Sequence, residues 1–146
     1  MHDYITNDNT IIFSPKYNKP LNPELNIQTQ YKKIIFSNHK LTDRILEAYK
    51  QVNYHNLHYQ GINYIGSKFN QHLGSSLSNC TSLTHILFGA SFNCPLANAL
   101  DNCIALTCIS FGFGFNCPLA NALDNCTLLT HIDFGLAFNC PLANSL

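Results

Sequence analysis

The sequence predicts an α/β repeat solenoid: a right-handed coil with short parallel strands on one side and short helices or irregular turns on the other. Two observations predict this fold. The segment FNCPLANALDNC occupies residues 92–103 and recurs letter for letter at 115–126, and FNCPLAN returns at 138–144. Between the copies run LTHILFG, LTCISFG and LTHIDFG, which begin at Leu83, Leu106 and Leu129. Both segments recur every 23 residues, so one structural unit is repeated along the chain.

Each unit is expected to hold one strand, a turn and a short helix. The strand of LTHILFG points three apolar side chains into the core: Leu83, Ile86 and Phe88. Gly89 then permits a turn, and Pro95 suits the first helical position because its missing N–H would be unpaired there. The apolar residues of that helix share one face: Leu96, Ala99, Leu100 and Cys103. Stacking of successive coils then buries these side chains, and each contributes about 1.5–3 kcal/mol.

The repeat extends in degenerate form toward the N-terminus. The segment IIFSPKYNKPL at 11–21 aligns with ILFGASFNCPL at 86–96, and strands are expected to end at residues 13, 36, 64, 88, 111 and 134. The longest spacing contains LTDRILEAYKQV at 41–52, in which Thr42 is a candidate N-cap and apolar residues recur at helical spacing. An inserted helix is the favoured interpretation there, and an ordinary polar loop is the alternative.

The chain is therefore interpreted as a single solenoid domain over residues 1–146. Degenerate repeats fill residues 1–40, the inserted helix fills 41–53, and regular repeats fill 54–146, the last of them incomplete.

Asparagine follows the aromatic residue of every copy, at Asn93, Asn116 and Asn139, and earlier at Asn18 and Asn70. Because a buried amide must find hydrogen-bond partners, we expect each side chain to bond the backbone of the neighbouring turn.

Six of the seven cysteines form two columns at the repeat period, and Cys108 takes the place of a histidine. We interpret the columns as small buried hydrophobic residues. Disulfides between adjacent coils are the alternative, which an intracellular setting disfavours. Zinc binding by His85, Cys108 and His131 is a sharper alternative, but ligands about 4.8 Å apart in a row do not surround one ion. We expect no metal and no cofactor.

Composition excludes several classes of function. The formal charge is zero, all eight Lys and Arg lie between Lys16 and Lys68, and no basic stripe is present, so nucleic acid is not an expected partner. No signal peptide is visible, and no apolar run approaches the roughly 18 residues of a membrane span. We expect no membrane contact and a cytoplasmic location. A Cys–His pair without an orienting third group does not make a nucleophile, so no enzymatic activity is expected.

The motif L-T-H-I-x-F-G-x-x-F-N-x-P-L, which begins at Leu83, resembles the FNIP repeat of slime-mould and amoeba-infecting giant-virus proteins. The segment NCTSLTHI at 79–86 is also similar to the BspA-like leucine-rich repeat (LRR). Both resemblances imply a parallel-stranded solenoid used for protein interaction, in the host cytoplasm if the chain is viral. Many FNIP-repeat proteins resemble F-box adaptors of ubiquitin ligases, with the F-box ahead of the repeats. Here residues 11–36 already resemble repeats.

The leading functional hypothesis is a non-catalytic scaffold that binds an unidentified protein through the outward strand positions. These positions are Thr84, His85, Leu87, Thr107, Cys108, Ser110, Thr130, His131 and Asp133. Three alternatives stay open. The sequence stops within a unit without a polar capping repeat, which favours a homodimer through the C-terminal coil. The second alternative is a truncated relic of a longer repeat protein. The third is the substrate-recognition part of a ubiquitin-ligase adaptor that lacks its F-box.

Overall fold

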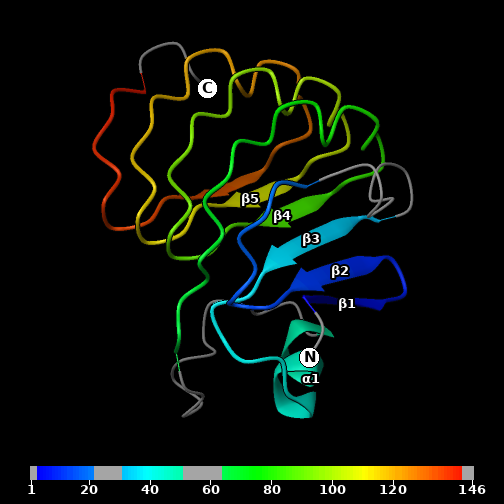
Figure 1. Ribbon diagram of the computed structural model, residues 1–146. Coiled ribbons are helices and arrows are strands. Elements are labelled where there is room, and N and C mark those ends of the chain that lie inside the picture. Colours follow the sequence, from blue (N-terminus) through cyan, green and yellow to red (C-terminus); the bar gives the residue numbers. More distant parts are fainter. Residues whose placement is uncertain (1–2, 22–30, 51–63, 143–146) are drawn as a thin grey trace.

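The computed structural model describes residues 3–21, 31–50 and 64–142. Its strands form one sheet in the order β1 (Tyr4–Asn7), β2 (Thr10–Phe13), β3 (Lys33–Phe36), β4 (His85–Leu87), β5 (Cys108–Ser110) and β6 (His131–Asp133). The pair β1 and β2 is an antiparallel hairpin, and every later pair is parallel. Figure 1 shows the sheet along one side of the coil and the return segments stacked on the other. The expected parallel-strand solenoid is confirmed.

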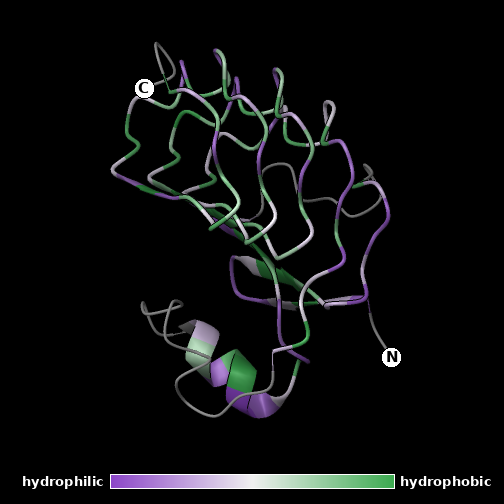
Figure 2. Cartoon of the chain, turned by 90° about the vertical axis from the view of Figure 1, so that its left-hand side faces the viewer, coloured by the Kyte–Doolittle hydropathy of each residue, from purple (hydrophilic) through white to green (hydrophobic). Residues whose placement is uncertain are grey.

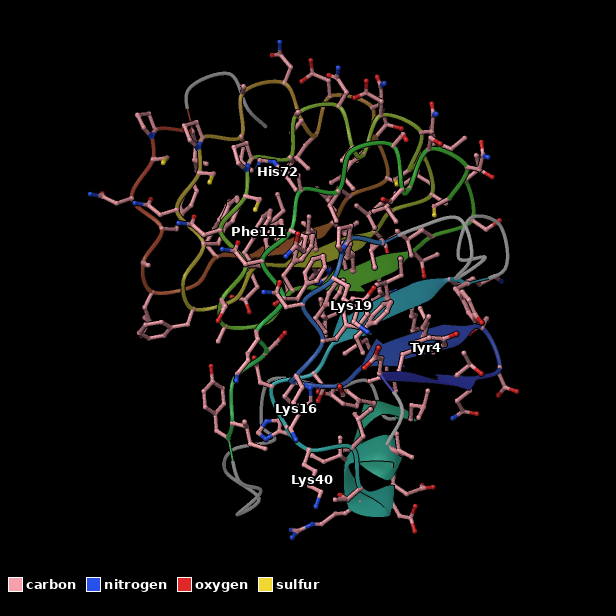
Figure 3. The ribbon with its side chains drawn as sticks, viewed as in Figure 1. Tyr4, Lys16, Lys19, Lys40, His72 and Phe111 are labelled. Carbon is pink, nitrogen blue, oxygen red and sulfur yellow. The ribbon has the colours of Figure 1, made fainter. Side chains whose placement is uncertain are left out.

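Two columns of stacked aromatic rings run through the interior of the coil. The first column joins the strand ends, and in it Phe111 lies 5.8 Å from both Phe88 and Phe134. The second column follows the turn, where Phe115 lies 5.9 Å from Phe92 and 6.0 Å from Phe138. Figure 3 shows Phe111 projecting into the coil. Because an aromatic ring lies at the same place in each unit, with Tyr17 in the first and phenylalanine in the later ones, the interior extends by repetition, as expected for a solenoid.

The return side is built from turns instead of the short helices that Pro95 and the following apolar residues predict. The N–H of Ala99 bonds the carbonyl of Leu96 at 2.9 Å, and further bonds of the same i to i+3 type follow toward Cys103. Ala97 has a φ of +49°, a left-handed conformation that interrupts a helix. The apolar face of the segment is nevertheless buried, so the turns close the core as the helices were expected to do.

The asparagine column forms a ladder along the outside of the coil. The side-chain oxygen of Asn70 accepts the N–H of Asn93 at 2.8 Å, and Asn93 accepts the N–H of Asn116 in the same way. The hydrogen-bonding expectation is confirmed, but these asparagines are exposed and not buried. Their oxygens hold each coil to the next from its surface.

A long insertion separates β3 from β4. It contains α1 (Asp43–Lys50), which lies within the range expected for the inserted helix, and the hydroxyl of Thr42 accepts the N–H of Ile45. The expected strand ending at Tyr64 falls mostly on residues 59–63, which lie outside the described residues; among the described strands, β3 pairs directly with β4. The strand that follows β3 in the sheet is thus β4, 23 residues before β5 in the regular repeat.

The helix α1 packs on the outward face of the N-terminal strands. Its residues Ile45 and Tyr49 form a second hydrophobic cluster with Ile12 of β2, Ile35 of β3 and Leu87 of β4. Figures 1 and 2 show α1 on the side of the sheet away from the stacked return segments. The first strands are thus covered on both faces, whereas the outward face of β5 and β6 has no such cover among the described residues.

Candidate interaction surface

The outward residues of β4, β5 and β6 lie in two rows across the sheet. Pairing of the strands places Cys108 opposite both His85 and His131. The second row contains Leu87, Ser110 and Asp133 in the same register. The strand register thus places these positions side by side on one face of the sheet, while their role in binding stays a prediction.

The three threonines of the predicted surface support the stacking of the coils. The hydroxyl of Thr107 donates to the carbonyl of Thr84 at 3.1 Å, and that of Thr130 donates to the carbonyl of Thr107 at the same distance. The hydroxyl of Thr84 completes the series by donating to the carbonyl of Lys32 at 3.0 Å. Because each hydroxyl has one proton to donate, the threonines act mainly as a structural ladder.

Leu87 lies on the outward face of the sheet, as predicted, but it is not exposed to solvent. Only 9% of its surface is exposed, because it packs in the cluster that α1 forms over the outward face of β2 and β3. We therefore define the strand face as the remaining outward residues: His85, Cys108, Ser110, His131 and Asp133.

The polar groups of the strand face are held by neighbouring side chains. A hydrogen bond of 2.8 Å joins the Thr84 hydroxyl to Nδ1 of His85. Since that hydroxyl donates its proton to the carbonyl of Lys32, Nδ1 of His85 is the donor in this pair. Burial lowers the pKa of His85, and the charges of Lys33 and His131 lower it further, so the neutral imidazole is favoured. The Ser110 hydroxyl donates to the carboxylate of Asp133 at 3.3 Å.

The cysteines are all free thiols, and burial raises the pKa of most of them. The pKa of Cys80 rises to about 11 and that of Cys103 to about 12. Burial and the charge of Asp133 raise the pKa of Cys108 on the strand face. A raised pKa keeps a thiol protonated and therefore a poor nucleophile or metal ligand. In the part of the chain that the structure describes, no three His, Cys, Asp or Glu side chains are grouped as a metal site.

Sequence reasoning missed an open groove beside the strand face, where the strands end. It has a volume of about 480 Å³, and its lining includes Asp133, Tyr64 and two residues of the turns, Phe113 and Leu136. Phe113 is 59% exposed and Leu136 is 86% exposed. The sequence signals this groove by a change at one repeat position, which is Ala90 in the first regular copy and Phe113 and Leu136 in the next two. Because these large apolar residues are exposed in a turn, packing of the core does not explain why they replace a small residue.

The three C-terminal copies, beginning at Asn79, Asn102 and Asn125, differ through residue 142 at only six repeat positions. None of these positions contributes to the main hydrophobic core. All six lie on the strand or in the segments next to it, whereas the return segment FNCPLAN is identical in every copy. Through residue 142, variation is thus confined to the strand side of the coil, and the one later difference in the sequence is Ser145, which replaces Ala99 and Ala122.

A coil with one short parallel strand and one turn-rich return in each unit is a leucine-rich-repeat-like solenoid. The fold is similar to the crystal structure of CroV588, a circular LRR protein from a giant virus, with a TM-score of 0.51 at 20% sequence identity. The match covers 94% of this chain and 19% of that protein, so this chain spans about a fifth of its length. No protein-family model matches the sequence, and no curated protein matches it either. Among the described residues, no helix has the length and apolar character that a bilayer crossing requires.

Proposed function

We propose that this protein is a non-catalytic interaction scaffold that binds a partner protein through the strand face. The observation that carries the proposal is that, through residue 142, the near-identical copies differ only on the strand side. Exposed return-side residues such as Ala97 and Asn98 are unchanged at Ala120 and Asn121. Exposure alone therefore does not explain which positions vary, while a contact surface on the strand side does.

The chemistry of the strand face also suits a protein partner. It combines imidazole, hydroxyl, thiol and carboxylate groups on a rigid sheet, and its only formal charge at neutral pH is that of Asp133. Such a surface obtains complementarity from shape and hydrogen bonds more than from long-range attraction. The raised thiol pKa values give no support for nucleophilic catalysis.

The motif that begins at Leu83 supports assignment of the units to the FNIP type of leucine-rich repeat, and we infer a cytoplasmic site of action. The similarity to an LRR protein supports a repeat scaffold in general terms.

The test compares three tagged baits in lysate from the cells that make the protein. The face variant carries Cys108→Glu and His131→Glu, and the matched control carries Asn98→Glu and Asn121→Glu on the return side. We expect a partner that wild type and control capture equally and the face variant loses by at least about tenfold, because a buried unpaired carboxylate is costly. The loss must then be reproduced with the purified partner.

Two results would contradict the proposal. A partner that the face variant retains and the return-side control loses would place binding on the opposite side of the coil. Capture of the chain itself and of no other protein would favour self-association instead.

A further inference from the structure

The groove beside the strand face has a lining that differs from the rest of the molecule. Its rim combines large exposed apolar side chains with the carboxylate of Asp133. Phe113 and Leu136 come from equivalent turns of two successive coils, and Tyr64, which is 55% exposed, lines the same groove from the end of the insertion. Three separate parts of the fold thus bring apolar surface to one carboxylate.

Glycine residues form the floor of the groove, so no side chain fills it. A Cβ at Gly112 would collide with the carbonyl oxygen of Gly89, and one at Gly135 would collide with the carbonyl oxygen of Gly112. These contacts show that the turns stack with no space for a side chain between them. The groove therefore runs across successive coils, with backbone below it and side chains along its edges.

Two of the six varying repeat positions contribute to this groove. One is Ala90 in the first regular copy and becomes Phe113 and Leu136 in the next two. The other changes from Leu87 to Ser110 and then to Asp133. The copies therefore acquire apolar bulk and negative charge in neighbouring columns, away from the part of the sheet that α1 covers.

The charge of residues 69–146 favours a cationic ligand in the groove. Residues 69–146 contain Asp101, Asp124 and Asp133 but no lysine or arginine. The coils that carry Phe113, Asp133 and Leu136 thus contain no lysine or arginine, so a cation brought to this part of the groove meets a carboxylate without a competing lysine or arginine of the same coils. Aromatic side chains such as Phe113 and Tyr64 also attract cations over their ring faces, and a guanidinium stacks on them well.

We propose that the groove binds an extended protein segment that presents an arginine or lysine next to an apolar side chain. The cation lies at Asp133, and the apolar side chain packs against Phe113 and Leu136. This inference rests on the proposed function, because it names the partner chemistry for the same side of the coil.

The test uses a phage-displayed library of random heptapeptides selected on the folded wild-type protein. The selected peptides are then synthesised and their affinities measured for three variants. The groove variant carries Phe113→Ser and Leu136→Ser. Its matched control carries Ile104→Ser and Leu128→Ser, which are 55% and 57% exposed on the other flank of the strands. The third variant is Asp133→Asn.

We expect the selected sequences to be enriched in a cation beside an apolar residue. The groove variant should weaken their binding by about tenfold or more, as truncation of an anchoring contact does, and the control should leave it unchanged. Asp133→Asn should weaken binding and reduce its dependence on salt, because the charge pair is screened by ions. In wild type, the peptide should shift the amide resonances of Gly112 and Gly135 more than that of Gly74.

Three results would overturn the inference: no peptide above background, selected peptides without cations, or equal binding by wild type and the groove variant. The glycine shifts provide a readout in the unmodified protein, so loss of folding in a variant does not obscure the result. Peptides that are insensitive to the groove variant and lost with Cys108→Glu and His131→Glu would leave the proposed function standing and remove only the groove. If the bait with Cys108→Glu and His131→Glu captured the same partner as wild type, that result would instead contradict the proposed function.

Discussion

The side-chain oxygen of Asn38 accepts a 2.8 Å hydrogen bond from the backbone N–H of Ala90, which lies 52 residues further along the chain. The same oxygen accepts the N–H of Ser67 at 2.8 Å. The backbone carbonyl of Asn38 accepts the N–H groups of Ile65 and Gly66. Asn38 thus joins the two ends of the insertion and ties them to the next coil, so the solenoid continues as if the insertion were absent.

Replacement of Asn38 by alanine should destabilise the fold. It leaves two partly buried backbone N–H groups, of Ser67 and Ala90, without their acceptor, at a cost of about 1–3 kcal/mol each if water does not reach them. The measurement is the free energy of unfolding in urea, followed by circular dichroism. The Asn38→Asp variant keeps the acceptor oxygen and should lose much less. Equal stability of wild type and Asn38→Ala would show that water replaces the amide.

The period of the fold could be predicted from the sequence because the interior repeats. Each copy places Leu, Ile and Phe at the same offsets, so the repeat period alone predicts that the phenylalanine rings of successive coils stack. The turns were harder to predict, because Ala97 adopts a positive φ that its residue type does not signal. Its neighbours Pro95 and Leu96 suit a helix equally well, so the backbone conformation depends on the stacked coils on either side.

The sequence carries a signal for the cover over the outward face of the first strands. The strands β2 and β3 contain consecutive apolar residues, Ile11-Ile12-Phe13 and Ile34-Ile35-Phe36, so both of their faces are apolar. Continuous apolar runs are typical of strands that are covered on both sides. The outward column then changes from Ile35 to Leu87 and on to Ser110, and this change marks where the cover by α1 ends.

The asparagine ladder should contribute to stability at each step. Asn93→Ala removes the acceptor for the N–H of Asn116 and for the thiol of Cys117, both of which lie near its side-chain oxygen. Because the site is exposed and water can replace part of the interaction, we expect a loss of about 0.5–1.5 kcal/mol in the free energy of unfolding. The matched control is Asn98→Ala, whose exposed amide has no hydrogen bond among the described residues. A control as damaging as Asn93→Ala would contradict the role of the ladder.

The raised pKa of Cys103 should make the fold sensitive to alkali. Burial, with the neighbouring thiols Cys80 and Cys126, raises this pKa from 9.0 to about 12. The folded state then retains a proton that the unfolded state loses, so stability falls as the pH rises from 9 toward 12. This thiol contributes a slope of up to about 1.4 kcal/mol per pH unit. Urea unfolding across that range should give a shallower slope for Cys103→Ala, and an unchanged slope would exclude this thiol as a source of the effect.

The neighbours of His85 should set the pH at which the strand face gains positive charge. Burial lowers the pKa of His85 first, and the ammonium group of Lys33 on the adjacent strand lowers it further. Lys33→Gln removes the second cause and keeps the first, so the pKa of His85 should rise while remaining below its ordinary value of 6.5. Titration of the imidazole proton resonances measures this change directly. The control is Lys68→Gln, because Lys68 is exposed and does not contribute to the lowered pKa of His85. Because the folded pKa is lowered, the neutral ring stabilises the fold above pH 6.5, and this contribution declines as the pH falls below that value toward the folded pKa. An unchanged pKa in Lys33→Gln would show that the charge of Lys33 does not contribute to keeping His85 neutral.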